Sequence, residues 1–107
     1  GYTWDTQNLA QDIETAQRGW LLARTMLKNE TINLVVFDEL TYPISYGWLD
    51  LDQILIDLKN RPAMQHVIIT GRNAPDTLCE SADTVTEFRN IKHAFYSGIK
   101  AQKGIDL

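Results

Sequence analysis

Two neighbouring carboxylates, Asp38 and Glu39, directly follow the apolar run Leu-Val-Val-Phe at 34–37. Such a run of β-branched and aromatic residues predicts a strand buried on both faces, as in parallel sheets covered by helices. Ligands of open α/β sheets bind at the carboxyl ends of the strands. Acids at that place, next to a nucleotide, hold Mg²⁺ directly or through water. The same pair could instead be exposed carboxylates that cap the next turn, and the run alone does not decide between these interpretations.

A site for Mg²⁺ and a triphosphate also needs backbone amides that cradle the phosphates, and a lysine. The chain contains no Gly-x-x-x-x-Gly-Lys-Ser/Thr motif, so it carries only half of such a site. Gly71 and Arg72 follow a second stretch, His-Val-Ile-Ile-Thr at 66–70, that is expected to form a buried strand. Arg72 could bind a phosphate or an acidic partner through two hydrogen bonds, although a solvated arginine in a turn is an equal alternative.

Aromatic residues form two groups. Tyr2 and Trp4 alternate with small polar residues, so both rings would face the same side of an extended segment. Tyr42, Tyr46 and Trp48 lie in a segment that a proline and a glycine keep from being a clean helix, so a loop or a short helical piece is expected. Both groups could be packing aromatics, which spacing alone favours, or a flat surface for a large conjugated ligand.

The histidines and the cysteine do not suggest a zinc site. His66 and His93 have no cysteine or second histidine at ligand spacing. Cys79 is expected to be buried and inert rather than a nucleophile. A single cysteine excludes an internal disulfide and agrees with a reducing cytoplasm.

Length and charge narrow the classes of protein further. The 107 residues suffice for one small domain. The net charge of -4, with scattered cations, gives no sign of a nucleic-acid surface. No apolar run is long enough to cross a bilayer, and no signal peptide is recognised. We therefore expect a cytoplasmic protein with no nucleic-acid or membrane partner.

The elements that must position these side chains alternate between helices and strands. Apolar residues spaced by three and four form one stripe in the first of them, and Asp50 is the expected cap of the second helix. The expected helices span 7–29, 51–60 and 75–81, and the expected strands span 34–37, 66–70 and 83–88. This order predicts an α/β domain whose three-stranded, mainly parallel sheet is flanked by helices, with the last strand at an edge.

Taken together, these segments resemble the P-loop ATP:corrinoid adenosyltransferases of bacterial cobalamin biosynthesis and salvage, also called cob(I)yrinic acid a,c-diamide adenosyltransferases. The two most specific matches are Gly-Tyr-Thr-Trp-Asp-Thr-Gln-Asn at 1–8 and Leu-Val-Val-Phe-Asp-Glu-Leu-Thr-Tyr at 34–42. Further matches lie at 61–62, 66–72 and 82–87 and in stretches of 91–106. The resemblance covers essentially the whole chain.

The resemblance implies a RecA-like P-loop fold and a homodimer. It implies transfer of the 5′-deoxyadenosyl group of ATP to the cobalt of a reduced corrinoid, with release of triphosphate; cobalt(I) is the nucleophile that attacks the 5′-carbon. The family's metal-binding acid corresponds to Glu39, with Asp38 beside it at the Walker-B position and Mg²⁺ as the ion. Thr41, Tyr42 and Arg72 are further candidates for a nucleotide or substrate loop.

The family's corrinoid-binding aromatic pair corresponds to Tyr2 and Trp4, with Tyr2 in place of the usual phenylalanine. Family members are thought to use these rings to displace the lower ligand of a cobalt(II) corrinoid. Four-coordinate cobalt(II) is easier to reduce, because no axial donor raises the energy of the accepting orbital. The resemblance also implies a flavoprotein as the reductant.

The departure from the family pattern is the phosphate cradle, because the family's glycine-rich loop, lysine and Mg²⁺-binding threonine precede the region equivalent to Gly1. Residues 1–107 are therefore expected to be the C-terminal part of a single adenosyltransferase domain, with a partial RecA-like fold. We expect this chain alone to bind ATP poorly, to be inactive, and to self-associate or exchange domains through exposed apolar surface. Two alternatives remain open: a non-catalytic α/β interaction or regulatory module, and an unrelated ATPase of the RecA type.

Overall fold

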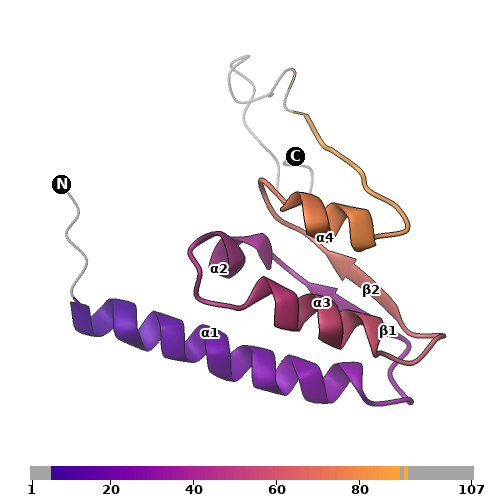
Figure 1. Ribbon diagram of the computed structural model, residues 1–107, viewed down its shortest axis with the longest axis horizontal. Coiled ribbons are helices and arrows are strands. Elements are labelled where there is room, and N and C mark those ends of the chain that lie inside the picture. The colour runs from indigo at the N-terminus through magenta and orange to yellow at the C-terminus, as the bar shows by residue number, and fades with distance from the viewer. Residues whose placement is uncertain (1–5, 90, 92–107) are drawn as a thin grey trace, which may run out of the picture.

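The computed structural model describes residues 6–89 and 91, with Thr6 and Gln7 described by their backbone alone. These residues form a mixed α/β structure in which α1 and α3 run alongside each other over a small sheet (Figure 1). The elements follow in the order α1 (Thr6–Leu27), β1 (Leu34–Phe37), α2 (Thr41–Ser45), α3 (Leu51–Lys59), β2 (His66–Ile69) and α4 (Asp76–Ser81). The α/β class predicted from the sequence is thus confirmed.

The apolar stripe of the first predicted helix becomes the buried face of α1. Trp20, Ala23 and Leu27 on this stripe are buried in the core. The helix ends at Leu27, two residues before the predicted end at Asn29. The Asn29 side chain accepts a hydrogen bond from the Thr31 backbone N–H at 3.0 Å, and this local turn directs the chain out of the helix.

Helix α3 has the ends that its sequence predicts to within one residue. The Asp50 carboxylate accepts a hydrogen bond from the Asp52 backbone N–H at 3.0 Å, which confirms Asp50 as the N-cap. At the other end, Arg61 donates to the Leu58 and Gln65 carbonyls at 2.8 and 2.9 Å and thereby joins the end of α3 to the start of β2. The segment with the proline and the glycine contains the short helix α2, and the helix predicted over 75–81 appears as α4.

Strands β1 and β2 pair in parallel, with Leu34 opposite His66 and Phe37 opposite Ile69. The prediction that the central strand is buried on both faces is wrong. Val35 is buried against the helices, whereas Leu34 and Val36 are 52% and 56% exposed. In the part of the chain that the structure describes, helices pack against one face of the sheet, so alternate side chains of the strands face solvent.

The prediction of a third strand over 83–88 is also wrong. This segment has no strand assignment, and Phe88 within it is 92% exposed. Alternation of Val85 with polar residues favours an extended backbone, but a strand exists only where a neighbour supplies hydrogen bonds. Among the described residues the sheet has two strands, β1 and β2.

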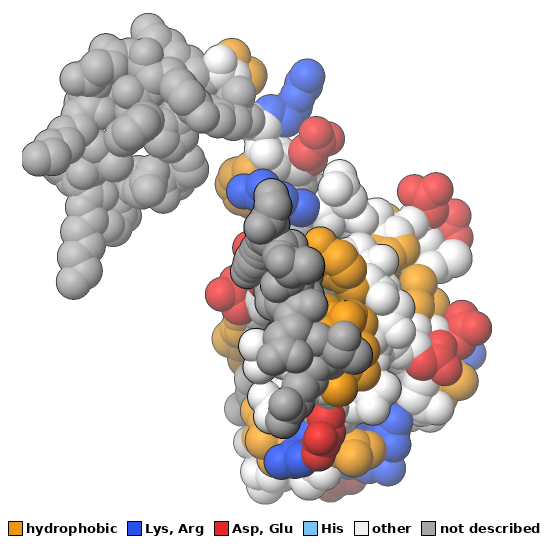
Figure 2. All heavy atoms as spheres, turned by 90° about the vertical axis from the view of Figure 1, so that its left-hand side faces the viewer, with side chains coloured by type: hydrophobic (Ala, Val, Ile, Leu, Met, Phe, Trp, Pro, Cys, Tyr) orange, Lys and Arg blue, Asp and Glu red, His pale blue; other side chains and the backbone are white. Residues whose placement is uncertain are grey.

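The hydrophobic core lies between the helices and the covered face of the sheet. It joins residues from α1, β1, α3 and α4 and from the loops around α2, and its buried members are Trp20, Ala23, Leu27, Val35, Leu40, Leu49, Ile54, Leu58 and Leu78. Other large apolar side chains remain at the surface, and the space-filling view shows hydrophobic side chains gathered in a band between charged ones (Figure 2). Val35 and Leu40 are both members of this core, so the chain is anchored on either side of the two acids.

Candidate functional site

Asp38 and Glu39 lie at the carboxyl end of β1, where the sequence places them. Both residues are exposed, so their carboxylates are accessible to a ligand. Glu39 has φ of 59°, in the left-handed region that residues other than glycine rarely adopt. Such a conformation costs free energy and persists only where the surrounding structure enforces it. The turn that carries the acids is therefore a constrained one.

Thr70, the residue after β2, supplies that constraint. Its backbone N–H donates to the Phe37 carbonyl at 2.9 Å, and its own carbonyl accepts from the Leu40 N–H at 3.1 Å. Its hydroxyl donates to Asp38 Oδ1 at 2.8 Å and accepts from the Glu39 N–H at 3.0 Å. Thr70 thus bonds each of the consecutive residues 37–40, and the ends of the two strands are locked together.

Gly71 and Thr41 bring the next residues of the two strand ends into close contact. A Cβ atom placed on Gly71 would lie 1.9 Å from Thr41 Oγ1, and Gly71 has φ of 154°. Only glycine permits this approach. Thr41 is 3% exposed, so this candidate for the substrate loop packs beneath the turn.

An apolar groove begins at the two acids. Its walls come from α1, from the end of β1, and from α2 and the residues on either side of it, and Asp38 and Glu39 lie among its lining residues. The α1 wall consists of three small residues, Ala16, Gly19 and Ala23, together with Trp20. A carboxylate pair at the edge of an apolar groove is an arrangement that can bind a ligand with both a charged and an apolar part.

The second aromatic group forms a cluster beside this turn. The rings of Tyr42 and Tyr46 have centroids 4.8 Å apart, and those of Tyr46 and Trp48 are 5.4 Å apart. Tyr42 and Tyr46 are exposed, while Trp48 is half-buried. The cluster is consistent with both interpretations made from the sequence, because it packs on itself and still presents ring surface to solvent.

The other residues that the sequence singled out either make no hydrogen bond with the turn at Asp38 and Glu39 or lie outside the described residues. Arg72 and His66 are exposed, and Cys79 is half-buried, less covered than the sequence predicts. Tyr2, Trp4 and His93 lie outside the described residues. No group of three or more His, Cys, Asp or Glu side chains among residues 6–89 and 91 is arranged to hold a metal ion. No helix in that part of the chain is long and apolar enough to cross a membrane.

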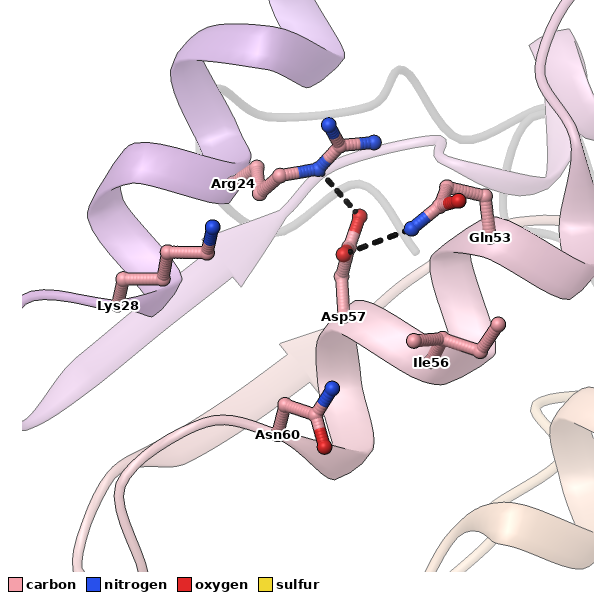
Figure 3. Close-up of a pocket in the computed structure, with 6 residues that line it drawn as sticks. All are labelled: Arg24, Lys28, Gln53, Ile56, Asp57 and Asn60. Atoms are coloured by element: carbon pink, nitrogen blue, oxygen red, sulfur yellow. Dashed lines mark hydrogen bonds and ion pairs between the residues drawn. The ribbon is translucent and has the colours of Figure 1, made fainter.

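A second polar cluster, centred on Asp57, joins α1 to α3. Asp57 Oδ2 accepts hydrogen bonds from Trp20 Nε1 at 2.8 Å and Arg24 Nε at 2.9 Å, and Oδ1 accepts from Gln53 at 3.1 Å. Figure 3 shows the Asp57 carboxylate of α3 between Arg24 of α1 and Gln53 of its own helix. Burial alone would raise the pKa of Asp57, but hydrogen bonds from Arg24, Trp20 and Gln53 and the charge of Arg24 outweigh it and lower the pKa.

Sequence reasoning placed Asp38 and Glu39 at the end of β1, which the structure confirms, but it did not single out Thr70 or Asp57. The signal for Thr70 was present, because it directly follows the strand that pairs with β1, and a parallel register brings the carboxyl ends of the two strands together. For Asp57 the signal was its place, three residues after Ile54 and one before Leu58 on the buried face of α3. A charged residue at such a position requires a partner.

Comparisons with known proteins agree on one family. The model of the family described as ATP:corrinoid adenosyltransferase BtuR/CobO/CobP matches residues 1–107. A corrinoid adenosyltransferase of Pseudomonas aeruginosa is 49% identical over 107 residues, which are 100% of this chain and 53% of that protein. One from Escherichia coli is 46% identical over 106 residues, or 99% of this chain and 54% of the relative. Corrinoid adenosyltransferase CobA of Salmonella typhimurium is 44% identical, with the same coverage of 99% and 54%. The chain therefore spans about half the length of the curated relatives it matches.

Proposed function

The chain belongs to the ATP:corrinoid adenosyltransferase family, and from this premise we propose that it forms the metal- and corrinoid-binding part of such an enzyme. The reaction would transfer the 5′-deoxyadenosyl group of ATP to the cobalt of a reduced corrinoid and release triphosphate. The observation that supports this role is the accessible Asp38–Glu39 pair, held at the carboxyl ends of two parallel strands. This is the place where nucleotide-binding α/β proteins carry their metal-binding acids.

Mg²⁺ fits the donor set at this turn. In nucleotide sites the ion is held by one or two carboxylates, and phosphate oxygens and water complete its octahedron. Glu39 would bind the ion and Asp38 would lie beside it, and both offer carboxylate oxygens as ligands. When bound, Mg²⁺ would neutralise charge on the triphosphate as it leaves.

The role proposed for the aromatic residues concerns the corrinoid. Tyr2 and Trp4 would cover the lower face of the corrinoid and exclude its axial ligand, as the family resemblance implies. Tyr42, on α2, and Arg72, in the loop after β2, would contact nucleotide or substrate, and Thr41 would support the start of α2 from below. Exposure of Tyr42 and Arg72 supports this part of the proposal.

The rest of the assembly is proposed on the same resemblance. Phosphate-cradling amides and a lysine would come from sequence other than these residues, since the chain has no Gly-x-x-x-x-Gly-Lys-Ser/Thr motif. With that sequence the domain would have a RecA-like fold and would act as a cytoplasmic homodimer. A flavoprotein would deliver the electron that converts cobalt(II) to cobalt(I).

The test is an absorbance titration of cobalt(II) cobalamin with the 107-residue chain. We expect a shift toward the spectrum of the four-coordinate corrinoid, and we expect Trp4→Ala to abolish it. Phe88→Ala is the matched control, because Phe88 is an exposed aromatic residue with no proposed role. No adenosylcobalamin should form when ATP and a reductant are added to this chain alone. A wild-type chain that leaves the spectrum unchanged would contradict the corrinoid role.

A further inference from the structure

We propose that Thr70 is a positioning residue for the two metal-binding acids. Its hydroxyl orients the Asp38 carboxylate and holds the backbone of Glu39 in the conformation that presents the Glu39 side chain to a ligand. The inference rests on the metal role proposed above for Asp38 and Glu39. Thr70 acts through these neighbours and does not itself need to touch the ion.

The Thr70 hydroxyl makes one hydrogen bond as a donor, to Asp38, and one as an acceptor, from Glu39. The proton goes to Asp38 Oδ1 at 2.8 Å, which leaves the second carboxylate oxygen available to a metal ion. A hydrogen bond to an ionised carboxylate is stronger than one between neutral groups and restricts rotation of the carboxylate. One carboxylate oxygen is therefore occupied by the protein, and the orientation of the other is set.

The lone pair accepts the Glu39 N–H at 3.0 Å, and the Thr70 carbonyl accepts the Leu40 N–H at 3.1 Å. These two bonds lie on either side of the Glu39 peptide unit that carries the φ of 59°. An unfavoured conformation of this kind relaxes unless several contacts determine it together. Thr70 supplies both contacts from the neighbouring strand, and Gly71 removes the side chain that would push the two strand ends apart.

The position at the end of a strand does not by itself require a threonine side chain. Valine has the same branched shape as threonine and suits a strand equally well, but it lacks the hydroxyl. If Thr70 only completed the sheet, its backbone bonds to Phe37 and Leu40 would suffice, and valine would serve as well. The hydroxyl bonds to Asp38 and Glu39 are what the positioning role adds.

The experiment measures Mn²⁺ binding by electron paramagnetic resonance, with Mn²⁺ in place of Mg²⁺ on the 107-residue chain. We expect Thr70→Val to weaken binding by about tenfold or more, as losses of groups that orient metal ligands do, and Thr70→Ser to restore most of it. In a Glu39→Gln background, Thr70→Val should have little further effect, because the carboxylate proposed to bind the ion is then absent. Thr25→Val is the matched control: the Thr25 hydroxyl bonds the Leu21 carbonyl on α1, far from the turn in the sequence.

A second measurement needs no metal. Amide hydrogen exchange should speed up at Glu39 in Thr70→Val, while the amides within α3 exchange as in the wild type.

Three results would overturn the inference. Unchanged Mn²⁺ affinity in Thr70→Val, with a loss in Glu39→Gln, would remove the positioning role and leave the metal site standing. A loss in Thr70→Val that Thr70→Ser does not restore would indicate a merely structural role. Equal binding by Glu39→Gln and the wild type would refute the metal site itself, and the role of Thr70 with it.

Discussion

Replacing Asp57 by alanine tests whether the buried cluster between α1 and α3 holds the two helices together. Asp57 is 9% exposed and accepts three hydrogen bonds. Its removal leaves the Trp20 N–H buried without a partner, at a cost of about 1–3 kcal/mol. The Arg24 side chain is 30% exposed, so water can solvate it in the variant. Loss of its ion pair with Asp57 therefore adds about 1 kcal/mol at most. We therefore expect Asp57→Ala to lower the free energy of unfolding by about 3 kcal/mol.

The assay is urea denaturation followed by far-UV circular dichroism. A domain of this size has a total stability of about 5–15 kcal/mol, so the expected loss is large enough to measure. Asp12→Ala is the matched control, because Asp12 is exposed on the same helix as Trp20 and should change stability by less than about 0.5 kcal/mol. A double-mutant cycle with Arg24→Ala isolates the ion pair. If Asp57→Ala stays within about 0.5 kcal/mol of the wild type, the cluster does not stabilise the fold.

The lowered pKa of Asp57 adds a pH dependence to this test. A carboxyl group whose pKa is lower in the folded state than its ordinary value of 3.8 stabilises the fold above that value. This contribution is lost as the pH falls through the folded pKa. The difference in unfolding free energy between the wild type and Asp57→Asn should therefore be largest near neutral pH and should shrink below pH 3.8. A difference that grows on acidification would contradict the assigned direction.

Three further perturbations test other parts of the structure. Gly71→Ala should destabilise the fold by about 2 kcal/mol or more in thermal denaturation, because its Cβ would lie 1.9 Å from Thr41 Oγ1. Gly19→Ala is the control: its Cβ would lie in open space within α1, so it should stabilise the fold by about 0.5–1 kcal/mol. Glu39→Gly should leave the melting temperature unchanged or higher, since glycine favours the left-handed backbone, while Mn²⁺ binding is lost; a large drop in melting temperature would refute the strain. Sedimentation should show self-association of the wild type and a shift toward monomer in Val36→Lys, whose side chain lies on the open face of the sheet; a monomeric wild type would contradict this.

The elements that the sequence predicted correctly are those with local causes. The stripe of α1 and the Asp50 cap of α3 depend on residues a few positions apart, so their pattern is visible in the chain itself. The position of Asp38 and Glu39 at the end of β1 was predicted for the same reason. Where the signal is periodic or lies within one turn, the sequence contains most of the information about the structure.

The errors concern features that depend on distant parts of the chain. A strand over 83–88 needs a hydrogen-bonding neighbour, and burial of Val36 needs a layer on the second face of the sheet. The alternation of apolar and polar residues and the apolar runs in the sequence contain no information about either. Gln65 is a further case, because its side chain is buried and donates to the Met26, Asn29 and Ile32 carbonyls more than thirty positions earlier. A glutamine before a strand looks like an ordinary surface residue until the fold brings these acceptors to it.

Position 39 is where stability and the proposed metal role make opposite demands. A left-handed residue at the end of a strand favours glycine, since a Cβ in this conformation costs roughly 1–2 kcal/mol. Glutamate at this position therefore requires a compensating interaction, and the hydroxyl of Thr70, on the neighbouring strand, provides one by accepting the Glu39 N–H. The same hydroxyl also bonds Asp38, so the group that offsets the strain orients the second acid as well. The strained backbone at Glu39 and the hydrogen bonds of Thr70 are therefore two parts of one arrangement, and the Glu39→Gly and Thr70→Val variants probe its two halves separately.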